Sequence, residues 1–415
     1  MPTEFQEHIF PNGMKLLHKK TFSPVVHQAL IFKVGSRDES AEQQGMAHFV
    51  EHCLFKGTQK RKTFHILSRL DDVGGDLNAY TGKEETTLYA AVLRTDFKRA
   101  AELLADIGFQ SVFPEKEIAK EVDVITDEIK AYKDSPSDHV FDLFDEYIFP
   151  NHPLGNNILG TEAHLRSFNK QSTLDFYRNN YMPSNAVVGI SGSISFERVV
   201  RTWEAILGDF KGSGHSKERQ NVGLYTPQQV RIPTPHIQSH LVIGNRAYGV
   251  REEKMLALLL ANNILGGPGM NTRLNLRIRE KFGLTYHLES FYTPYTDTGS
   301  WGIYLSTDPM QLDLVLSKVY KEMKDLRNNA LGTIQLSKAK KQLQGQIAIG
   351  QDSPGSAVSG AARMWLNFDE IEPLELTMNR ISEITASDIL EVCNEVFLEK
   401  DLSQILLSGD SSEVN

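Results

Sequence analysis

Two kinds of hydrophobic pattern alternate along the chain and predict both strands and helices. Short apolar or alternating segments predict strands at residues 28–34, 239–244 and 299–307, and a Gly-rich, strand-like region covers 74–93. Helical patterns, several of them rich in carboxylates and bases four positions apart, cover residues 41–56, 95–109, 115–132, 252–265, 311–329, 336–349 and 386–397. Because these helices and hairpin-like strands alternate irregularly, we expect an α+β fold and not a doubly wound α/β fold.

The order of strand, helix and strand occurs twice, which indicates an internal repeat. A shift of about 210 positions lays residues 50–57 over residues 260–267, which have similar apolar character and the same final Gly. Between the repeats, a stretch rich in Gly, Ser and Gln has the composition of an interdomain linker. We therefore predict two homologous halves, each a mostly antiparallel sheet packed with helices, at residues 1–212 and 233–415, with a linker at 213–232.

The composition argues against some kinds of binding partner and cellular location. The chain has 44 basic and 53 acidic residues and a formal charge of −9, which argues against binding to a nucleic-acid backbone. The longest apolar stretch, which includes 256–261, is far shorter than the roughly 18 residues that suggest a membrane span. Only two cysteines, Cys53 and Cys393, are present, so we expect no disulfide framework and a cytoplasmic location.

The strongest chemical signal is the segment His48-Phe49-Val50-Glu51-His52. On a helix, His48, Glu51 and His52 share one side, whereas Phe49 and Cys53 lie on the opposite side, so Cys53 is expected to pack in the core. Two imidazoles four residues apart can bind a single tetrahedral Zn²⁺, and the carboxylate between them can reach a water at the metal. This spacing is the inverse of His-Glu-x-x-His and occurs in metallopeptidases.

A catalytic zinc site needs a third protein ligand, and the helix predicted at 115–132 offers two candidates. Glu121 and Glu128 are seven residues apart, nearly two helical turns, so their side chains point the same way. Either carboxylate could bind the metal, while the other orients a histidine. On its own, this acidic stripe also fits an ordinary solvated helix surface.

The chain resembles the insulinase and mitochondrial-processing-peptidase family of inverted zinc metallopeptidases, in particular its short members of about half length. The resemblance covers nearly the whole chain and rests on five landmarks in order. They are HFVEHCLFKGT at 48–58, GGDLNAYT at 74–81, EVDVITDEI at 121–129, HPLGNNILGT at 152–161 and TRLNLRIREKFGLTY at 272–286.

The resemblance implies a role for each residue of the predicted site. His48, His52 and Glu128 correspond to the zinc ligands, one Zn²⁺ per chain, Glu51 to the general base and Glu121 to a supporting carboxylate. The resemblance further implies that a strand with three matching residues binds an extended peptide by main-chain hydrogen bonds. These three residues are Asn78, Ala79 and Tyr80.

The second half contributes a different pair of residues. In similar proteins an Arg and a Tyr seven residues apart contact the substrate, and Arg279 and Tyr286 match them here. The positions that correspond to His48, Glu51 and His52 by the repeat are 258, 261 and 262, which carry Leu, Ala and Asn and cannot bind zinc there. Because one chain carries both sets, the resemblance implies a homodimer in which each chain completes the other's site.

The expected function is therefore that of a zinc endopeptidase that hydrolyses extended or unfolded peptides inside a dimeric chamber. No presequence precedes the first half of the chain as given, so we expect a prokaryotic cytoplasmic peptidase. The alternative is a non-catalytic structural or partner subunit of the same family. Such inactive relatives typically lose zinc or base residues, whereas this sequence retains all of them. A zinc-binding or peptide-binding module without turnover is a further alternative.

Overall fold

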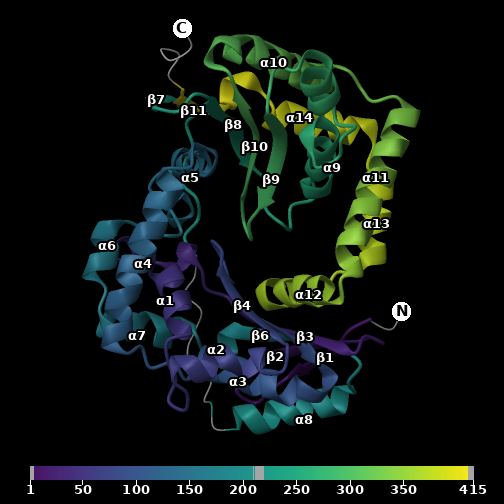
Figure 1. Cartoon of the computed structure of the whole chain (residues 1–415). Coiled ribbons are helices and arrows are strands. Elements are labelled where there is room, and N and C mark those ends of the chain that lie inside the picture. Colours follow the sequence, from purple (N-terminus) through teal and green to yellow (C-terminus); the bar gives the residue numbers. More distant parts are fainter. Residues whose placement is uncertain (1–3, 209, 211–218, 410–415) are drawn as a thin grey trace. The chain divides into compact units, whose positions relative to one another are not determined.

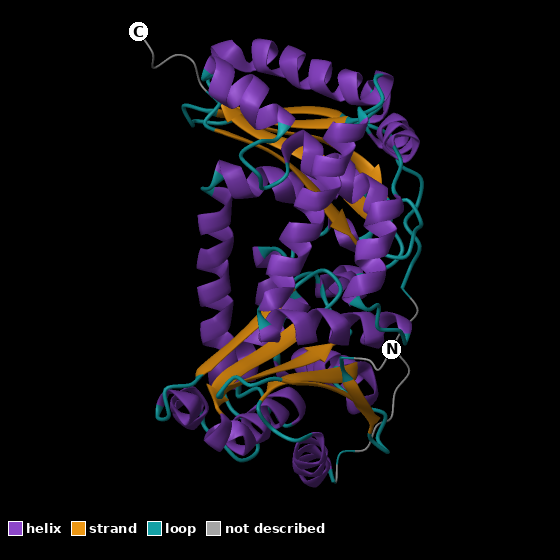
Figure 2. Ribbon diagram, turned by 90° about the vertical axis from the view of Figure 1, so that its right-hand side faces the viewer, coloured by secondary structure: helices purple, strands orange, loops and turns teal. Residues whose placement is uncertain are grey.

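The computed structural model describes residues 4–208, 210 and 219–409. Their contacts divide the chain into two compact units, and each unit takes segments from both ends of the sequence. The first unit contains Met1–Ile129, Asn156–Arg219 and Ala348–Leu374, and the second contains Lys130–Gly155, Gln220–Ile347 and Glu375–Asn415. In each unit, a sheet is flanked by helices (Figures 1 and 2).

The first unit is built on a six-stranded mixed sheet. Its strands lie in the order β1 (Gln6–Ile9), β2 (Lys15–Lys20), β6 (Ala186–Gly192), β3 (Val25–Phe32), β5 (Thr86–Leu93) and β4 (Asp76–Thr81). Only the β2–β6 pair of this sheet is parallel, and β4 forms one edge.

The second unit repeats this topology in a five-stranded sheet. Its order is β7 (Gln229–Pro233), β11 (Ser403–Ser408), β8 (Ser239–Ala247), β10 (Gly299–Thr307) and β9 (His287–Pro294). The β7–β11 pair is parallel and the other pairs are antiparallel, so the five strands correspond in order and direction to β2, β6, β3, β5 and β4. The predicted α+β fold with two sheet-and-helix halves is confirmed.

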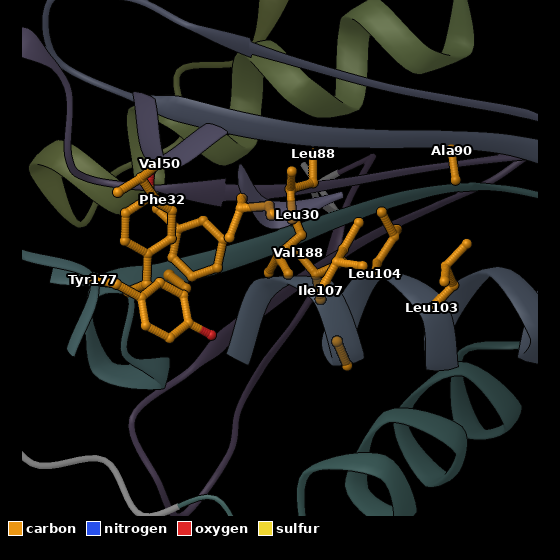
Figure 3. Packing of buried hydrophobic residues seen from close by; sticks show 14 of the residues in the cluster. Leu30, Phe32, Val50, Leu88, Ala90, Leu103, Leu104, Ile107, Tyr177 and Val188 are labelled. Atoms are coloured by element: carbon orange, nitrogen blue, oxygen red, sulfur yellow. The ribbon is translucent and has the colours of Figure 1, made fainter. Parts of the chain in front are cut away.

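The side chains on the two faces of the first sheet belong to two different apolar clusters. On one face, strand residues such as Leu30, Phe32 and Leu88 pack with Leu104 of α3 (Phe97–Phe109) and with Val50 of α1 (Met46–Leu54) (Figure 3). The opposite face is covered by α12 (Pro354–Phe368), which packs on β6, β2 and β3. This second cluster contains Leu17, Ala29, Ile31, Val187, Val358, Ala362, Trp365 and Leu366.

Of the remaining helices that the structure describes, five have bounds within a few residues of a predicted range, whereas no predicted range covers the other six. In the first part of the chain they are α2 (Thr63–Asp71), α4 (Glu115–Lys133), α5 (Pro136–Ile148), α6 (Glu162–Ser167), α7 (Lys170–Asn180) and α8 (Phe196–Leu207). In the second they are α9 (Met255–Gly266), α10 (Leu312–Asn328), α11 (Thr333–Asp352), α13 (Leu374–Glu383) and α14 (Ala386–Val396). None of the helices in the described part of the chain combines the length and the apolar composition needed to cross a membrane.

The predicted strand at 28–34 is β3, Val25–Phe32, and the predicted helix at 41–56 and linker at 213–232 also differ from the structure. The helix expected at 41–56 begins only at Met46, because Gly45 has a φ of 91° and a short 3₁₀ turn, Ala41–Gln43, precedes it. Of the linker expected at 213–232, residues 213–218 lie outside the described residues, whereas its end contributes to strand β7.

Candidate metal centre

Helix α1 presents two chemically different sides. Phe49, Val50 and Cys53 are buried in the apolar core of the first unit, as predicted for this side of the helix. Burial also raises the pKa of the Cys53 thiol well above its usual value, so the thiol stays protonated at neutral pH. The imidazoles of His48 and His52 lie on the other side, with their ring centroids 4.6 Å apart.

A third side chain from α4 joins the two imidazoles. Oε2 of Glu128 lies 3.9 Å from Nε2 of His48 and 3.7 Å from Nε2 of His52. One ligand atom from each of these three residues lies within 4.8 Å of the other two. Atoms bound about 2 Å from one tetrahedral ion are separated by roughly 3.3 Å, so the cluster is slightly wider than a closed zinc site.

The protonation state of His48 suits a metal ligand. Burial, reinforced by the neighbouring His52, lowers the pKa of His48 from 6.5 to about 3, so the imidazole is neutral at neutral pH. Its Nδ1 atom is buried and has no hydrogen-bond partner among the described residues. A neutral imidazole with Nδ1 protonated has its lone pair on Nε2, the atom that faces Glu128. The donor set therefore fits a zinc ion.

Glu121 lies behind His52 and not in the three-residue cluster. Its carboxylate accepts hydrogen bonds from Nδ1 of His52 (3.1 Å) and from Nζ of Lys56 (2.8 Å). Burial opposes ionisation of Glu121, but these two bonds and their charges leave its pKa below the usual value. A carboxylate that accepts from Nδ1 fixes the tautomer of His52 and directs its Nε2 toward the cluster.

Glu51 belongs to α1, and its side chain reaches Thr81 at the end of the edge strand β4. Burial raises the pKa of this carboxyl group, while hydrogen bonding with Thr81 of β4 opposes the shift. Its Oε2 atom is buried and, among the residues described, has no hydrogen-bond partner. Because α1 packs against β4, the end of the edge strand and the unpaired oxygen belong to one site.

The strand that carries Asn78, Ala79 and Tyr80 is the free edge of the first sheet. The side-chain oxygen of Asn78 accepts a hydrogen bond from the backbone N–H of Ala79 at 2.8 Å. This N–H therefore points to the open edge and not toward β5. Asn78 and Tyr80 are exposed, and Ala79 is half-buried.

A buried carboxylate that the sequence analysis missed fixes the start of α1. Glu39 accepts hydrogen bonds from the backbone N–H groups of Gly45 (2.9 Å) and Ala47 (2.7 Å). Burial raises the pKa of Glu39 to about 8, although both hydrogen bonds favour the ionised form. Glu39 follows a polar turn, and no pattern in the sequence shows that it folds back onto the helix six residues later.

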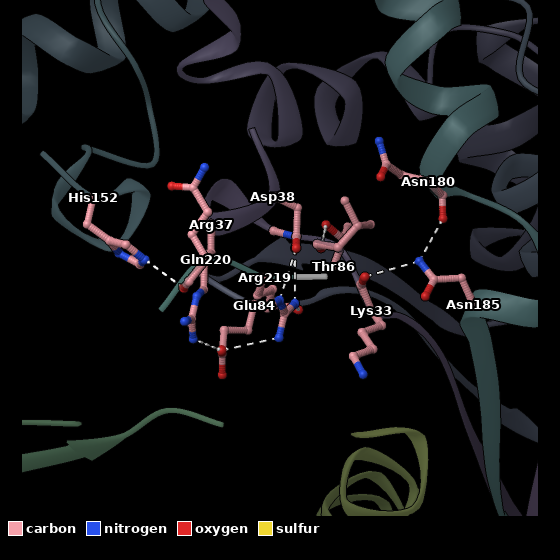
Figure 4. A network of polar contacts seen from close by, with 12 residues as sticks. Lys33, Arg37, Asp38, Glu84, Thr86, His152, Asn180, Asn185, Arg219 and Gln220 are labelled. Atoms are coloured by element: carbon pink, nitrogen blue, oxygen red, sulfur yellow. Dashed lines mark hydrogen bonds and ion pairs between the residues drawn. The ribbon is translucent and has the colours of Figure 1, made fainter. Parts of the chain in front are cut away.

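A charged network, also missed by sequence reasoning, holds the turn before Glu39 (Figure 4). The guanidinium of Arg219 contacts Asp38 at 2.9 Å and Glu84 at 3.2 Å, and Arg37 contacts Glu84 at 2.7 Å. Glu84 lies in the turn between β4 and β5, so these pairs join that hairpin to the turn that leads to α1.

Arg279 and Tyr286 belong to the second unit, whereas the cluster of His48, His52 and Glu128 belongs to the first. Arg279 lies in a π-helical turn, Asn275–Glu280, and 3.5 Å from Glu280. Tyr286 is 73% exposed just before β9.

The corresponding helix of the second half, α9, uses the same positions for packing. Leu258 and Ala261 are buried in the core of the second unit. Asn262 accepts a hydrogen bond from the indole N–H of Trp301 at 2.9 Å and donates one to the carbonyl of Ser290 at 3.4 Å. These three residues therefore have structural roles in the second unit.

Comparisons with known proteins identify relatives over most of the chain. Residues 15–162 match the family described as "Insulinase (Peptidase family M16)", and residues 167–343 match "Peptidase M16 inactive domain". A protein of Rickettsia felis named as an uncharacterized zinc protease is 32% identical over 99% of both chains. YmxG of Bacillus subtilis, which has the same kind of name, is 31% identical over 96% of both chains.

Solved structures share the fold at lower sequence identity. A Pseudomonas fluorescens structure described as a peptidase M16 inactive domain has a TM-score of 0.91 at 20% identity and covers 98% of both chains. A protease from Helicobacter pylori has a TM-score of 0.90 at 18% identity, with 97% of this chain and 99% of that chain covered. The chain belongs to the insulinase family of peptidases, peptidase family M16.

Proposed function

We propose that this protein is a zinc-dependent endopeptidase that hydrolyses extended or unfolded peptides. The observation that carries the proposal is the convergence of His48, His52 and Glu128, with ligand atoms within 4.8 Å of one another. These three residues would hold one Zn²⁺ per chain, and Glu121 would orient His52 through its Nδ1 hydrogen.

Each remaining group has a distinct chemical task in peptide hydrolysis. With zinc bound, the site gains a Lewis acid that polarises the peptide carbonyl and lowers the pKa of a water to about 7. Glu51 accepts the proton of the attacking water and later returns it to the leaving amine. Its raised pKa supports this role, because a general base works best when its pKa lies near the working pH.

The edge strand β4 supports an extended substrate. A backbone carbonyl of a peptide that pairs with β4 would accept the hydrogen bond from the N–H of Ala79, in place of the Asn78 side chain. Main-chain pairing of this kind favours an unfolded segment, because most backbone groups of a folded protein are already paired.

We further propose that two chains form a homodimer in which Arg279 and Tyr286 of one subunit contact the substrate at the other subunit's zinc site. The support for this arrangement is the family resemblance and the exposure of Tyr286. By hydrogen bonding, the two side chains would stabilise the oxyanion of the tetrahedral intermediate.

The Glu51→Gln variant tests the proposed function. We expect it to keep the zinc content of the wild type and to lose turnover of an unfolded peptide by about 10²- to 10⁴-fold, because the amide cannot accept the proton. Zinc is measured by elemental analysis and cleavage by mass spectrometry. Glu117→Gln, at a half-buried carboxylate of α4 that pairs with Lys120 and lies outside the three-residue cluster, is the matched control and should behave as the wild type.

Two outcomes of this experiment would contradict the proposal. Equal turnover in Glu51→Gln and in the wild type would remove the assigned base. A wild-type chain that binds zinc but cleaves no unfolded peptide would support the alternative, a non-catalytic subunit of the family.

A further inference from the structure

The exposed side chains of β4 project toward the face of the sheet that α12 covers. In the pairing of β4 with β5, Asn78 lies opposite Tyr89 and Tyr80 lies opposite Thr87. Tyr89 packs against the apolar cluster beneath α12, whereas Ala79 packs against the core on the side of α1. Because side chains alternate along a strand, Asn78 and Tyr80 share the face of Tyr89.

Arg363 of α12 holds the side chain of Tyr80 in one position. An Nη atom of Arg363 donates a hydrogen bond to the Tyr80 hydroxyl, and its Nε donates one to the carboxylate of Glu85. The guanidinium carbon also lies 5.9 Å from the centre of the Tyr80 ring. Tyr80 is therefore fixed at its hydroxyl end while the residue as a whole remains 44% exposed.

The guanidinium next to this ring is itself paired with a carboxylate. The positive charge of Arg363 is paired with Glu85, a mostly buried carboxyl group. A bound peptide would therefore contact a rigid, half-exposed aromatic ring at the free edge of the sheet, next to a guanidinium whose charge is already paired.

We propose that Tyr80, positioned by Arg363, determines specificity by taking an aromatic or large aliphatic side chain of the bound peptide. This inference rests on the proposed peptidase function. A peptide added to β4 directs alternate side chains to the face of Tyr80, and directly opposite side chains on neighbouring strands have Cβ atoms about 4.5–5.5 Å apart. Aromatic and aliphatic side chains gain most from such a contact with a fixed ring.

Cleavage of a peptide library tests the inference. Wild-type protein is incubated with zinc and an unfolded, proteome-derived peptide mixture, and the products are sequenced by mass spectrometry. We expect one position, at a fixed distance from the cleaved bond, to be enriched about 2- to 10-fold in aromatic and large aliphatic residues. Tyr80→Thr, which keeps a β-forming residue in the edge strand, should lose this enrichment, and Tyr80→Phe, which keeps the ring but not the hydrogen bond from Arg363, should retain only part of it.

Phe22→Ser is the matched control, because it removes a fully exposed aromatic side chain elsewhere in the same unit. It should leave the profile unchanged. A wild-type profile without enrichment, or an enrichment that survives in Tyr80→Thr, would overturn the inference while leaving the peptidase function intact. A wild-type chain that cleaves no peptide would overturn both.

Discussion

At the scale of single residues, burial sets the protonation states on which the site depends. It lowers the pKa of His48 to about 3 and raises the pKa values of Glu51 and Cys53. One physical cause, the poor solvation of the charged form, explains all three shifts. It leaves the imidazole neutral, raises the pKa of the carboxyl group and keeps the thiol protonated. Glu121 differs, because hydrogen bonds from His52 and Lys56 keep it ionised despite its burial.

A histidine outside the site should make stability depend on pH. His18 of β2 is fully buried and stacks on Phe196, and neither ring nitrogen has a partner among residues 4–208, 210 and 219–409. Burial, with a smaller effect of Lys20, lowers its pKa from 6.5 to about 4. Below pH 6.5, His18 binds a proton in the unfolded chain but stays neutral in the folded chain. The free energy of unfolding therefore falls as the pH falls toward 4.

We expect His18 to account for roughly 1.5 kcal/mol of stability lost between pH 6.5 and pH 5, because the slope approaches about 1.4 kcal/mol per pH unit only well below pH 6.5. Urea unfolding at both pH values measures this loss. In His18→Leu the loss should be smaller by about that amount, whereas His65→Leu, at an exposed position, should change nothing. An equal loss in wild type and His18→Leu would contradict the account.

At the scale of elements, the zinc helix is positioned by contacts at its N-terminus. Gly45 (φ 91°) and Gly160 (φ 72°) lie against each other, so that a Cβ on Gly160 would meet the carbonyl oxygen of Gln44 at 2.3 Å. Glu39 binds the first N–H groups of the same helix. The loop around Gly160, the turn before Glu39 and α1 thus form one arrangement that holds His48 in place.

Gly160→Ala should therefore disturb the metal centre as well as the fold. We expect it to lower the free energy of unfolding by roughly 1–3 kcal/mol more than Gly74→Ala does, and to weaken zinc binding. Gly74 also has a positive φ, 65°, but nothing lies within 4 Å of its Cβ position, so its variant isolates backbone strain. Urea unfolding and zinc titration measure both effects. Equal results for the two variants would contradict the role of this close contact.

The elements differ in how far the sequence predicts them. Strand β10, Gly299–Thr307, has the bounds expected from its alternation, and α4 ends one residue beyond its predicted range, because both signals are local. The His-x-x-Glu-His spacing is local too. By contrast, the contacts of Glu39, Arg219 and Arg363 join residues far apart in the sequence or in a turn, where no periodicity indicates a partner.

At the scale of the whole molecule, each compact unit contains a helix from the other half of the sequence. Helix α12, near the end of the chain, covers the first sheet, and α5, near residue 140, packs on β11, β8 and β10 of the second. An amphipathic pattern predicts that a helix buries one face, but it does not predict which sheet receives that face. The predicted spans 1–212, 213–232 and 233–415 therefore describe the repeat in the sequence. They do not describe the compact units, which take segments from both halves.

The proposed homodimer predicts complementation between two inactive chains. His48→Ala removes a ligand from the first half, and Tyr286→Phe removes a substrate contact from the second. If each site takes residues from both subunits, a mixed dimer contains one site with neither change. We expect peptide cleavage to reappear on mixing, with up to half of the wild-type activity per mixed dimer. Verified mixed dimers without activity would argue against shared sites.

The central claim, that His48, His52 and Glu128 hold a zinc ion, is tested most directly by equilibrium dialysis of the metal-free protein against zinc. The account predicts one zinc per wild-type chain and per Glu117→Gln control, and a loss of tight binding in Glu128→Gln, because the third carboxylate ligand is gone. Tight binding of one zinc by Glu128→Gln, with the affinity of the wild type, would contradict it.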